Sequence, residues 1–155
     1  MGLTNLQILD FTQKLKVPYF RGVYSLDLLP KDKRKCESFI VNLAKSSLPG
    51  THWVLVYRSN SEKIYFDSFG AVTPEIIQRY LKSKNEFEHN IKCIQRSTEQ
   101  IQQFNTDVCG HMCIFVLVYL YKYPKHSFNK ILKMFTNKTY KDFENKLKNW
   151  QENIM

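Results

Sequence analysis

The pattern of apolar and polar positions divides the chain into short helices and strands. Thr4-Asn5-Leu6-Gln7 has the form of a helix capping box, and the apolar residues after it suit a short amphipathic helix that Pro18 ends. The segment after Pro18, through residue 30, is predicted to be irregular. Strands are predicted where β-branched and aromatic residues concentrate, at 38–43, 51–58, 64–69 and 91–94. Further helices are predicted at 73–83, 109–121, 127–135 and 139–153.

The order of these elements indicates the fold class. Helices and strands are mixed without regular βαβ alternation, which favours an α+β fold. A chain of 155 residues suits one hydrophobic core, and no repeat or linker interrupts it. We therefore expect a single domain over residues 1–155, with a small mixed central sheet flanked by helices. The segment 109–121 lacks a polar face, so its helix should be buried.

The predicted hairpin formed by 51–58 and 64–69 brings His52 near Asp67. Opposed residues of an antiparallel pair share one face of the sheet. A two-residue turn at Ser59-Asn60 places His52 directly opposite Asp67, and a four-residue loop leaves them diagonal neighbours. A carboxylate on one ring nitrogen fixes the tautomer of a histidine and frees the other nitrogen to accept a proton. Taken alone, however, the pair favours a structural contact at a strand end.

Cys109 is the candidate nucleophile. It lies at the predicted start of the buried helix, where the partial positive charge and free N–H groups favour a thiolate. His52 beside it would hold the proton and deliver it to a leaving amine. Gly110 has no side chain, which would leave space for a substrate backbone. Gln102 or Gln103, in the polar segment before Cys109, would donate to an oxyanion together with the Cys109 backbone N–H.

The charge of the chain is compatible with a polyanionic partner and equally with a well-solvated surface. The chain has 23 Lys and Arg against 14 Asp and Glu, a formal net charge of +9. Basic residues gather between residues 122 and 148, and also at Lys31, Lys33, Arg34 and Lys35. We treat the second group as candidate DNA-binding residues.

The cysteines and the hydropathy exclude several other classes. The four cysteines do not have the spacing of zinc ligands and are sparse for a disulfide scaffold, so we expect reduced thiols in an intracellular protein and no metal. A zinc site made of Cys109, His111 and Cys113 would spread its ligands around one helix, and Cys113 is expected to pack in the core. No apolar run approaches the roughly 18 residues of a membrane span, and no secretion signal is evident.

Together these residues resemble the adenovirus proteases (adenains), whose catalytic groups follow the order His, acidic residue, Gln, Cys. Four motifs meet that order: GTHW at 50–53, YFDSFG at 65–70, STEQIQ at 97–102 and CGHMC at 109–113. PYFRGVY at 18–24 and IVNLA at 40–44 are also similar to segments that precede the catalytic His of the family. The resemblance covers roughly residues 1–121.

The resemblance implies a role for each catalytic candidate. His52 matches the base, Asp67 the residue that orients it, and Cys109 the nucleophile. Gln102 matches the oxyanion donor of the adenains, whereas the pattern of the related SUMO proteases favours Gln103. Adenains usually carry Glu at the position of Asp67, and the SUMO proteases carry Asp.

The resemblance also implies substrates, cofactors and a location. The family cleaves viral precursor proteins after small-residue motifs such as Gly-Gly or Gly-X-Gly, stimulated by DNA and by a short peptide from a capsid precursor. Cys93 lies near the position that forms a disulfide to that peptide, and Trp53 and Gly110 are expected at the substrate site. We expect a monomer in the host nucleus and in the virion, whose chemistry itself needs no cofactor.

Two other functions remain open. Asp67 and the QQFN stretch at 102–105 also fit a protease for a ubiquitin-like modifier. A basic nucleic-acid-binding module would carry the same Cys and His as structural residues.

Overall fold

The computed structural model describes residues 2–44, 52–82, 93–101 and 108–136, together with Asn145, Asn149 and Glu152. Five strands form one mixed sheet in the order β1-β2-β3-β4-β5, which confirms the α+β class. The outer pairs β1/β2 and β4/β5 are parallel, and the inner pairs are antiparallel. The strands are β1 (Phe20–Ser25), β2 (Glu37–Asn42), β3 (Trp53–Arg58), β4 (Lys63–Phe66) and β5 (Gln95–Arg96). The helices are α1 (Asn5–Lys14), α2 (Glu75–Lys82), α3 (Cys109–Lys122) and α4 (Phe128–Thr136).

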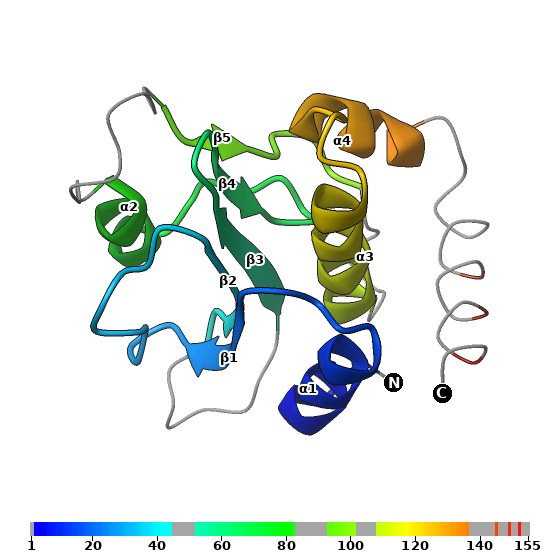
Figure 1. The fold of residues 1–155 in the computed structure, drawn as a ribbon, viewed down its shortest axis with the longest axis horizontal. Helices are drawn as coiled ribbons and strands as arrows, with labels where there is room; N and C mark the ends of the chain where they lie inside the picture. Colours follow the sequence, from blue (N-terminus) through cyan, green and yellow to red (C-terminus); the bar gives the residue numbers. More distant parts are fainter. Residues whose placement is uncertain are drawn as a thin grey trace.

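Helices cover both faces of the sheet, with α2 on one side and α3 on the other (Figure 1). Successive side chains of a strand point to opposite faces. Phe39 and Val41 on β2 accordingly pack in the cluster that includes α2, while Ile40 packs in the cluster that includes α3. Burial on both faces explains why residues 39–41 of β2 and 53–57 of β3 are continuous apolar runs in the sequence.

The buried helix α3 begins at Cys109, as the sequence predicts, and packs against β3. Val108 is its N-cap residue and has no polar side chain. No side chain in the described ranges caps the first turn of α3, so its N–H groups and positive partial charge remain directed at the space before the helix.

The other helix starts follow from local capping. The Thr4 backbone N–H donates to Gln7 Oε1 at 2.8 Å, and the Gln7 backbone N–H donates to Thr4 Oγ1 at 3.2 Å, so the predicted capping box is confirmed. At the start of α4, the Lys130 backbone N–H donates to Ser127 Oγ at 3.1 Å. Helix α2 starts at Glu75, two residues after the predicted start, and follows Thr73 and Pro74 in the chain.

The prediction of an irregular segment from residue 18 to residue 30 is wrong, because this segment contains β1. All residues of β1 are half-buried, so the strand has no apolar alternation that the sequence would reveal. Its pairing with β2 is also irregular between Phe20 and Val23, where Gly22 has a φ of 131°.

The predicted strand at 91–94 is misplaced. The structure has β5 at Gln95–Arg96, and residues 91 and 92 lie outside the described ranges. Most of the predicted helix at 139–153 also lies outside them, although Asn145, Asn149 and Glu152 are helical and exposed.

A buried carboxylate on β2 ties several elements together. Glu37 has no solvent exposure and accepts hydrogen bonds from Tyr80 Oη at 2.6 Å, Arg21 Nη1 at 3.0 Å and the Arg34 backbone N–H at 2.8 Å. Arg58 Nε lies 3.6 Å from the same carboxylate. Because these donors satisfy the buried charge, the carboxylate joins β1, α2 and the segment before β2.

Candidate active site

The register of the β3/β4 hairpin determines how His52 meets Asp67. Leu55 lies opposite Phe66, so the connection is a four-residue loop at 59–62 and the pair is diagonal rather than directly opposed. His52 Nε2 lies 2.6 Å from Asp67 Oδ1. Of the two registers that the sequence allows, the structure therefore has the longer loop, and the imidazole and carboxylate still meet.

Asp67 lies just beyond the end of β4 and is only 1% exposed. Hydrogen bonds from backbone and side-chain groups hold it in place. Its Oδ1 accepts a second hydrogen bond, from the Phe69 backbone N–H at 2.9 Å. Ser97 Oγ contacts the Asp67 backbone on both sides, donating to its carbonyl at 2.8 Å and accepting from its N–H at 2.8 Å. The carboxylate is therefore held as an acceptor directed at His52.

The His52 imidazole lies between charged and aromatic neighbours. Its side chain is 12% exposed, and the ring of Phe69 stacks on it with a centroid distance of 4.5 Å and an interplanar angle of 15°. Burial lowers the pKa of His52, but hydrogen bonds to Asp67 and to Cys109 outweigh it and raise the pKa to about 9. At neutral pH this histidine is therefore an imidazolium.

Cys109 is the first residue of α3 and is 7% exposed. Its sulfur lies close enough to the His52 imidazole to help raise the pKa of that ring. Since Nε2 is directed at Asp67, the nitrogen left for the sulfur is Nδ1. An imidazolium and a helix N-terminus beside a cysteine both stabilise the thiolate. The structure thus brings together the three residues that the sequence selected as base, orienting acid and nucleophile, while Gln102 and Gln103 lie outside the described ranges.

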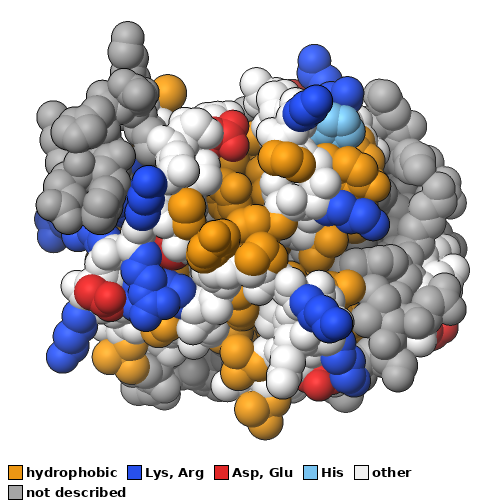
Figure 2. All heavy atoms as spheres, viewed as in Figure 1, with side chains coloured by type: hydrophobic (Ala, Val, Ile, Leu, Met, Phe, Trp, Pro, Cys, Tyr) orange, Lys and Arg blue, Asp and Glu red, His pale blue; other side chains and the backbone are white. Residues whose placement is uncertain are grey.

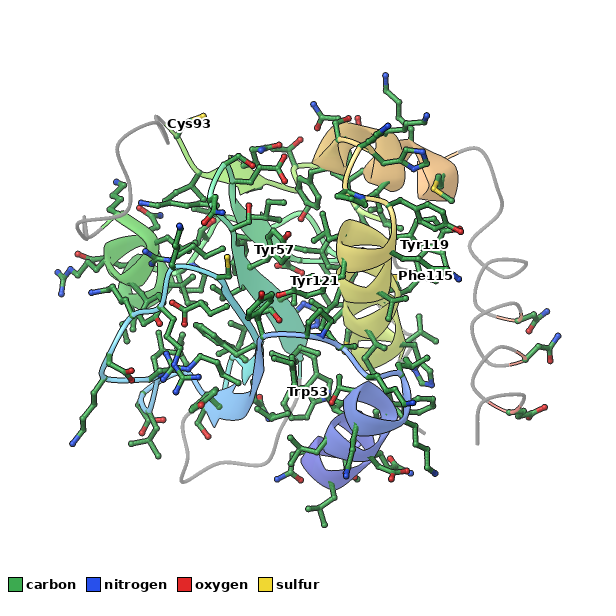
Figure 3. The ribbon with its side chains drawn as sticks, in the orientation of Figure 1. Trp53, Tyr57, Cys93, Phe115, Tyr119 and Tyr121 are labelled. Atoms are coloured by element: carbon green, nitrogen blue, oxygen red, sulfur yellow. The ribbon has the colours of Figure 1, made fainter. Side chains whose placement is uncertain are left out.

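Trp53 and Gly110 pack against each other beside the nucleophile. The indole Nε1 of Trp53 donates to the Leu3 carbonyl at 3.0 Å, and Figure 3 shows the side chain near α1. A Cβ on Gly110 would lie 3.1 Å from Trp53 Cδ1 and 3.3 Å from Leu3 Cβ. The expectation that Gly110 leaves space for substrate is therefore wrong, because Trp53 and Leu3 occupy that space.

Cys113 is buried one turn after Cys109. Its Sγ donates to the Trp53 carbonyl at 3.4 Å, and burial raises the pKa of this thiol well above its ordinary value. Cys113 is therefore a packing residue, as the sequence predicts, and its thiol should react slowly.

The other candidate residues lie away from this site. Cys93 is an exposed free thiol, and Figure 3 shows it at the upper edge of the view, well away from Trp53. In the basic group, Lys33 Nζ lies 5.3 Å from the centroid of the Tyr80 ring, and Arg34 Nε lies 3.8 Å from Asp32 Oδ2. The exposed members of the group are Lys31, Arg34 and Lys35.

Two residues of the site were not selected from the sequence. Phe69 was detectable, because a four-residue hairpin loop puts it opposite His52. Ser97 begins the STEQIQ motif, but nothing in that motif indicates a contact with Asp67, because α2 and a long connection separate the two residues in the chain. Among the described residues, no helix is long and apolar enough to cross a membrane.

Comparison with known proteins adds a family match. The sequence model of a family described as adenovirus endoprotease matches residues 20–149. The protease of bovine adenovirus 2 is 31% identical over 122 residues, covering 69% of this chain and 57% of the relative. The protease of bovine adenovirus 4 is 27% identical over 110 residues, covering 64% of this chain and 55% of the relative. The chain thus spans little more than half the length of these relatives.

A solved structure has a similar fold. A crystal structure of the ASFV protease superposes with a TM-score of 0.58 at 17% identity, covering 83% of this chain and 60% of that chain. At this identity the likeness concerns the fold, which is again α+β.

Proposed function

Because the chain belongs to the adenovirus endoprotease family, we propose that it is a cysteine endopeptidase with Cys109 as nucleophile, His52 as base and Asp67 as the residue that orients the base. The observation that supports this most directly is the position of the His52 imidazole. It hydrogen-bonds the carboxylate of Asp67 at 2.6 Å, and it lies close enough to Cys109, the first residue of a helix, for that thiol to help raise its pKa. A thiol nucleophile beside a base that a third group orients is the characteristic arrangement of nucleophilic catalysis.

The proposed reaction has two halves. The Cys109 thiolate attacks the scissile carbonyl carbon, and the oxyanion is stabilised by the Cys109 backbone N–H and by the side-chain amide of Gln102 or Gln103. The C–N bond then breaks as the His52 imidazolium donates its proton to the leaving amine, giving a thioester. Water attacks the thioester while His52 accepts its proton, which releases the acid product and restores the thiolate. A pKa of about 9 means that His52 carries the proton for the first half at neutral pH.

The substrates we propose are viral precursor proteins, cleaved at Gly-containing sites in the host nucleus and the virion. Family membership supports this choice over a protease for a ubiquitin-like modifier. The competing function is favoured by Asp67, which replaces the usual Glu of the adenains. Parallel assays on a Gly-Gly-containing viral-type peptide and on ubiquitin-like fusions separate the two, and cleavage of the fusions alone would reverse the choice.

DNA and a short activating peptide are proposed as stimulators. The formal net charge of +9 supports a DNA partner. On the face shown in Figure 2, however, Lys and Arg lie in separate groups around an apolar centre rather than in one stripe. An affinity for DNA that does not fall between low and moderate salt would contradict phosphate contacts. The exposure of Cys93 supports its use as a peptide tether, which a non-reducing gel after mixing with a cysteine-containing peptide would test.

The central experiment identifies the reactive thiol. The protein is treated with limiting iodoacetamide and the modified residue is mapped by mass spectrometry. We expect Cys109 to react first and Cys113 last, because burial raises the pKa of Cys113. Cys109→Ala should lower peptide cleavage by at least about 10³-fold, while the control Cys36→Ala retains it. Equal reactivity of Cys109 and Cys36, with unchanged activity of Cys109→Ala, would instead support a non-enzymatic nucleic-acid-binding module.

A further inference from the structure

We propose that Ser97 is a positioning residue for catalysis, whose hydroxyl fixes the backbone of Asp67 and so sets the direction in which the carboxylate meets His52. This inference rests on the proposed function, because the role of Asp67 does. Ser97 follows β5 directly, has no solvent exposure and does not touch the reacting atoms.

The contact occurs where the β4/β5 ladder ends. The last paired residues are Tyr65 on β4 and Arg96 on β5, and the Ser97 backbone N–H still donates to the Tyr65 carbonyl at 3.2 Å. Asp67 lies beyond the end of β4, where its backbone has left the ladder. The Ser97 hydroxyl serves both of its backbone groups instead, donating to the carbonyl and accepting from the N–H, each at 2.8 Å.

A hydroxyl suits this position because one oxygen is both donor and acceptor. An alanine at 97 would leave the buried N–H of Asp67 without this acceptor, which is a costly change in the interior. The Asp67 carboxylate lies only one methylene from the backbone. Any backbone shift therefore passes directly to Oδ1, which holds both His52 Nε2 and the Phe69 N–H.

The segment after Ser97 is bound to the same turn. The Ile101 backbone N–H donates to the Ser68 carbonyl at 2.7 Å. Gly70, with a φ of 70°, lies so close that an added Cβ would be 2.7 Å from the carbonyl carbon and oxygen of Glu99. The stretch from Ser97 to Ile101 thus lies along the Asp67 turn and leads directly to the two candidate oxyanion glutamines.

The test compares Ser97→Ala with a matched control. Ser38→Ala removes an equally buried hydroxyl on β2, where Ser38 Oγ accepts from Tyr121 Oη at 3.4 Å. Ser38 pairs with Tyr57, at the far end of the β2/β3 ladder from His52. For all variants kcat, KM, melting temperature and the NMR titration of the His52 ring are measured.

Ser97→Ala should lower kcat by about 10- to 100-fold with little change in KM, because it removes a partner that orients a side chain of the proposed catalytic site. The His52 titration should move to lower pH, because a displaced carboxylate stabilises the imidazolium less. Ser97→Thr, which keeps the hydroxyl, should recover most of kcat and of the titration. Ser38→Ala should change neither.

Wild-type kcat and titration in Ser97→Ala would overturn the proposal, and so would an equal loss in Ser38→Ala. If Ser97→Ala does not fold, Ser97→Cys provides the same test with a weaker donor and acceptor, and wild-type behaviour of that variant would overturn the proposal as well. The titration needs no substrate. If the wild-type protein cleaves no peptide, the proposed function fails, while the titration still decides the role of Ser97.

Discussion

Asp67→Asn removes the charge that faces His52 while keeping nearly the same side-chain shape. A His52 pKa raised from 6.5 to about 9 corresponds to about 3 kcal/mol in favour of the imidazolium over the neutral ring. Burial acts in the opposite direction, so the increase depends on the hydrogen bonds to Asp67 and Cys109. Without the carboxylate we expect the pKa of His52 to fall toward 6.5.

The assay is an NMR titration of the histidine Cε1–H signals. The chain has four histidines, so a His52→Gln variant assigns the signal. The titration is repeated in Cys109→Ala and in the double variant Asp67→Asn/Cys109→Ala, because the cycle separates the effect of the carboxylate from that of the thiol. Each single substitution should lower the pKa of His52, and the double substitution should lower it furthest.

Activity and stability should change with the same substitution. Asp-to-Asn changes in comparable triads lower kcat by about 10⁴-fold, and we expect a loss of that order. A histidine with a raised pKa contributes stability that is complete below pH 6.5 and is lost as the pH rises through about 9. The difference in unfolding free energy between wild type and Asp67→Asn, measured in urea, should therefore shrink between pH 6.5 and pH 9. A His52 that still titrates near pH 9 in Asp67→Asn would refute this reasoning.

Two further substitutions test the fold around the site. Glu37→Gln should destabilise the protein by about 3–5 kcal/mol in urea unfolding, because it removes the fully buried charge that Arg21 contacts at 3.0 Å. A loss below about 1 kcal/mol would contradict that role. Gly70→Ala should lower the free energy of unfolding by about 1–3 kcal/mol because φ is positive there, and by more because the added Cβ overlaps the backbone of residue 99. We expect kcat to fall as well. Gly22→Ala is the control, since its φ is also positive but an added Cβ meets nothing closer than 3.9 Å, and an equal loss of kcat there would contradict the link to the site.

The sequence predicts the helices and strands that have strong local signals. It fails where pairing between distant segments determines the structure. Helix α3 and strand β3 are continuous apolar runs, and their approximate positions follow from composition alone, whereas the predicted strand at 64–69 extends beyond β4, which ends at Phe66. The register of the β3/β4 hairpin does not follow from composition, because it depends on a loop closed by Ser59, whose backbone N–H donates to the Glu62 carbonyl at 2.9 Å and whose Oγ accepts from the Glu62 N–H at 3.1 Å. Strand β1 was missed because, as a half-buried edge strand, it has no alternation.

The residues of the site also divide into those that local motifs indicate and those that depend on long-range pairing. The order and spacing of the motifs are sufficient to select His52, Asp67 and Cys109, since each lies at an element boundary that the pattern reveals. Ser97 depends on the parallel pairing of β4 with β5, which joins segments far apart in the chain. For Gly110, the sequence suggests a role that the structure contradicts. A glycine beside a nucleophile suggests access for substrate, but only the tertiary packing reveals that Trp53 fills the space.

The proposed base and the proposed nucleophile leave the ribosome at different times. His52 and Asp67 belong to one hairpin, whereas the sulfur arrives later, on a helix that must still dock against β3. At synthesis rates of about 5–20 residues per second, the growing polypeptide carries a base and no nucleophile for about two to eight seconds. Under the proposed function, an unfinished chain cannot cleave neighbouring proteins, because cleavage needs Cys109 on an α3 that has been made and has docked.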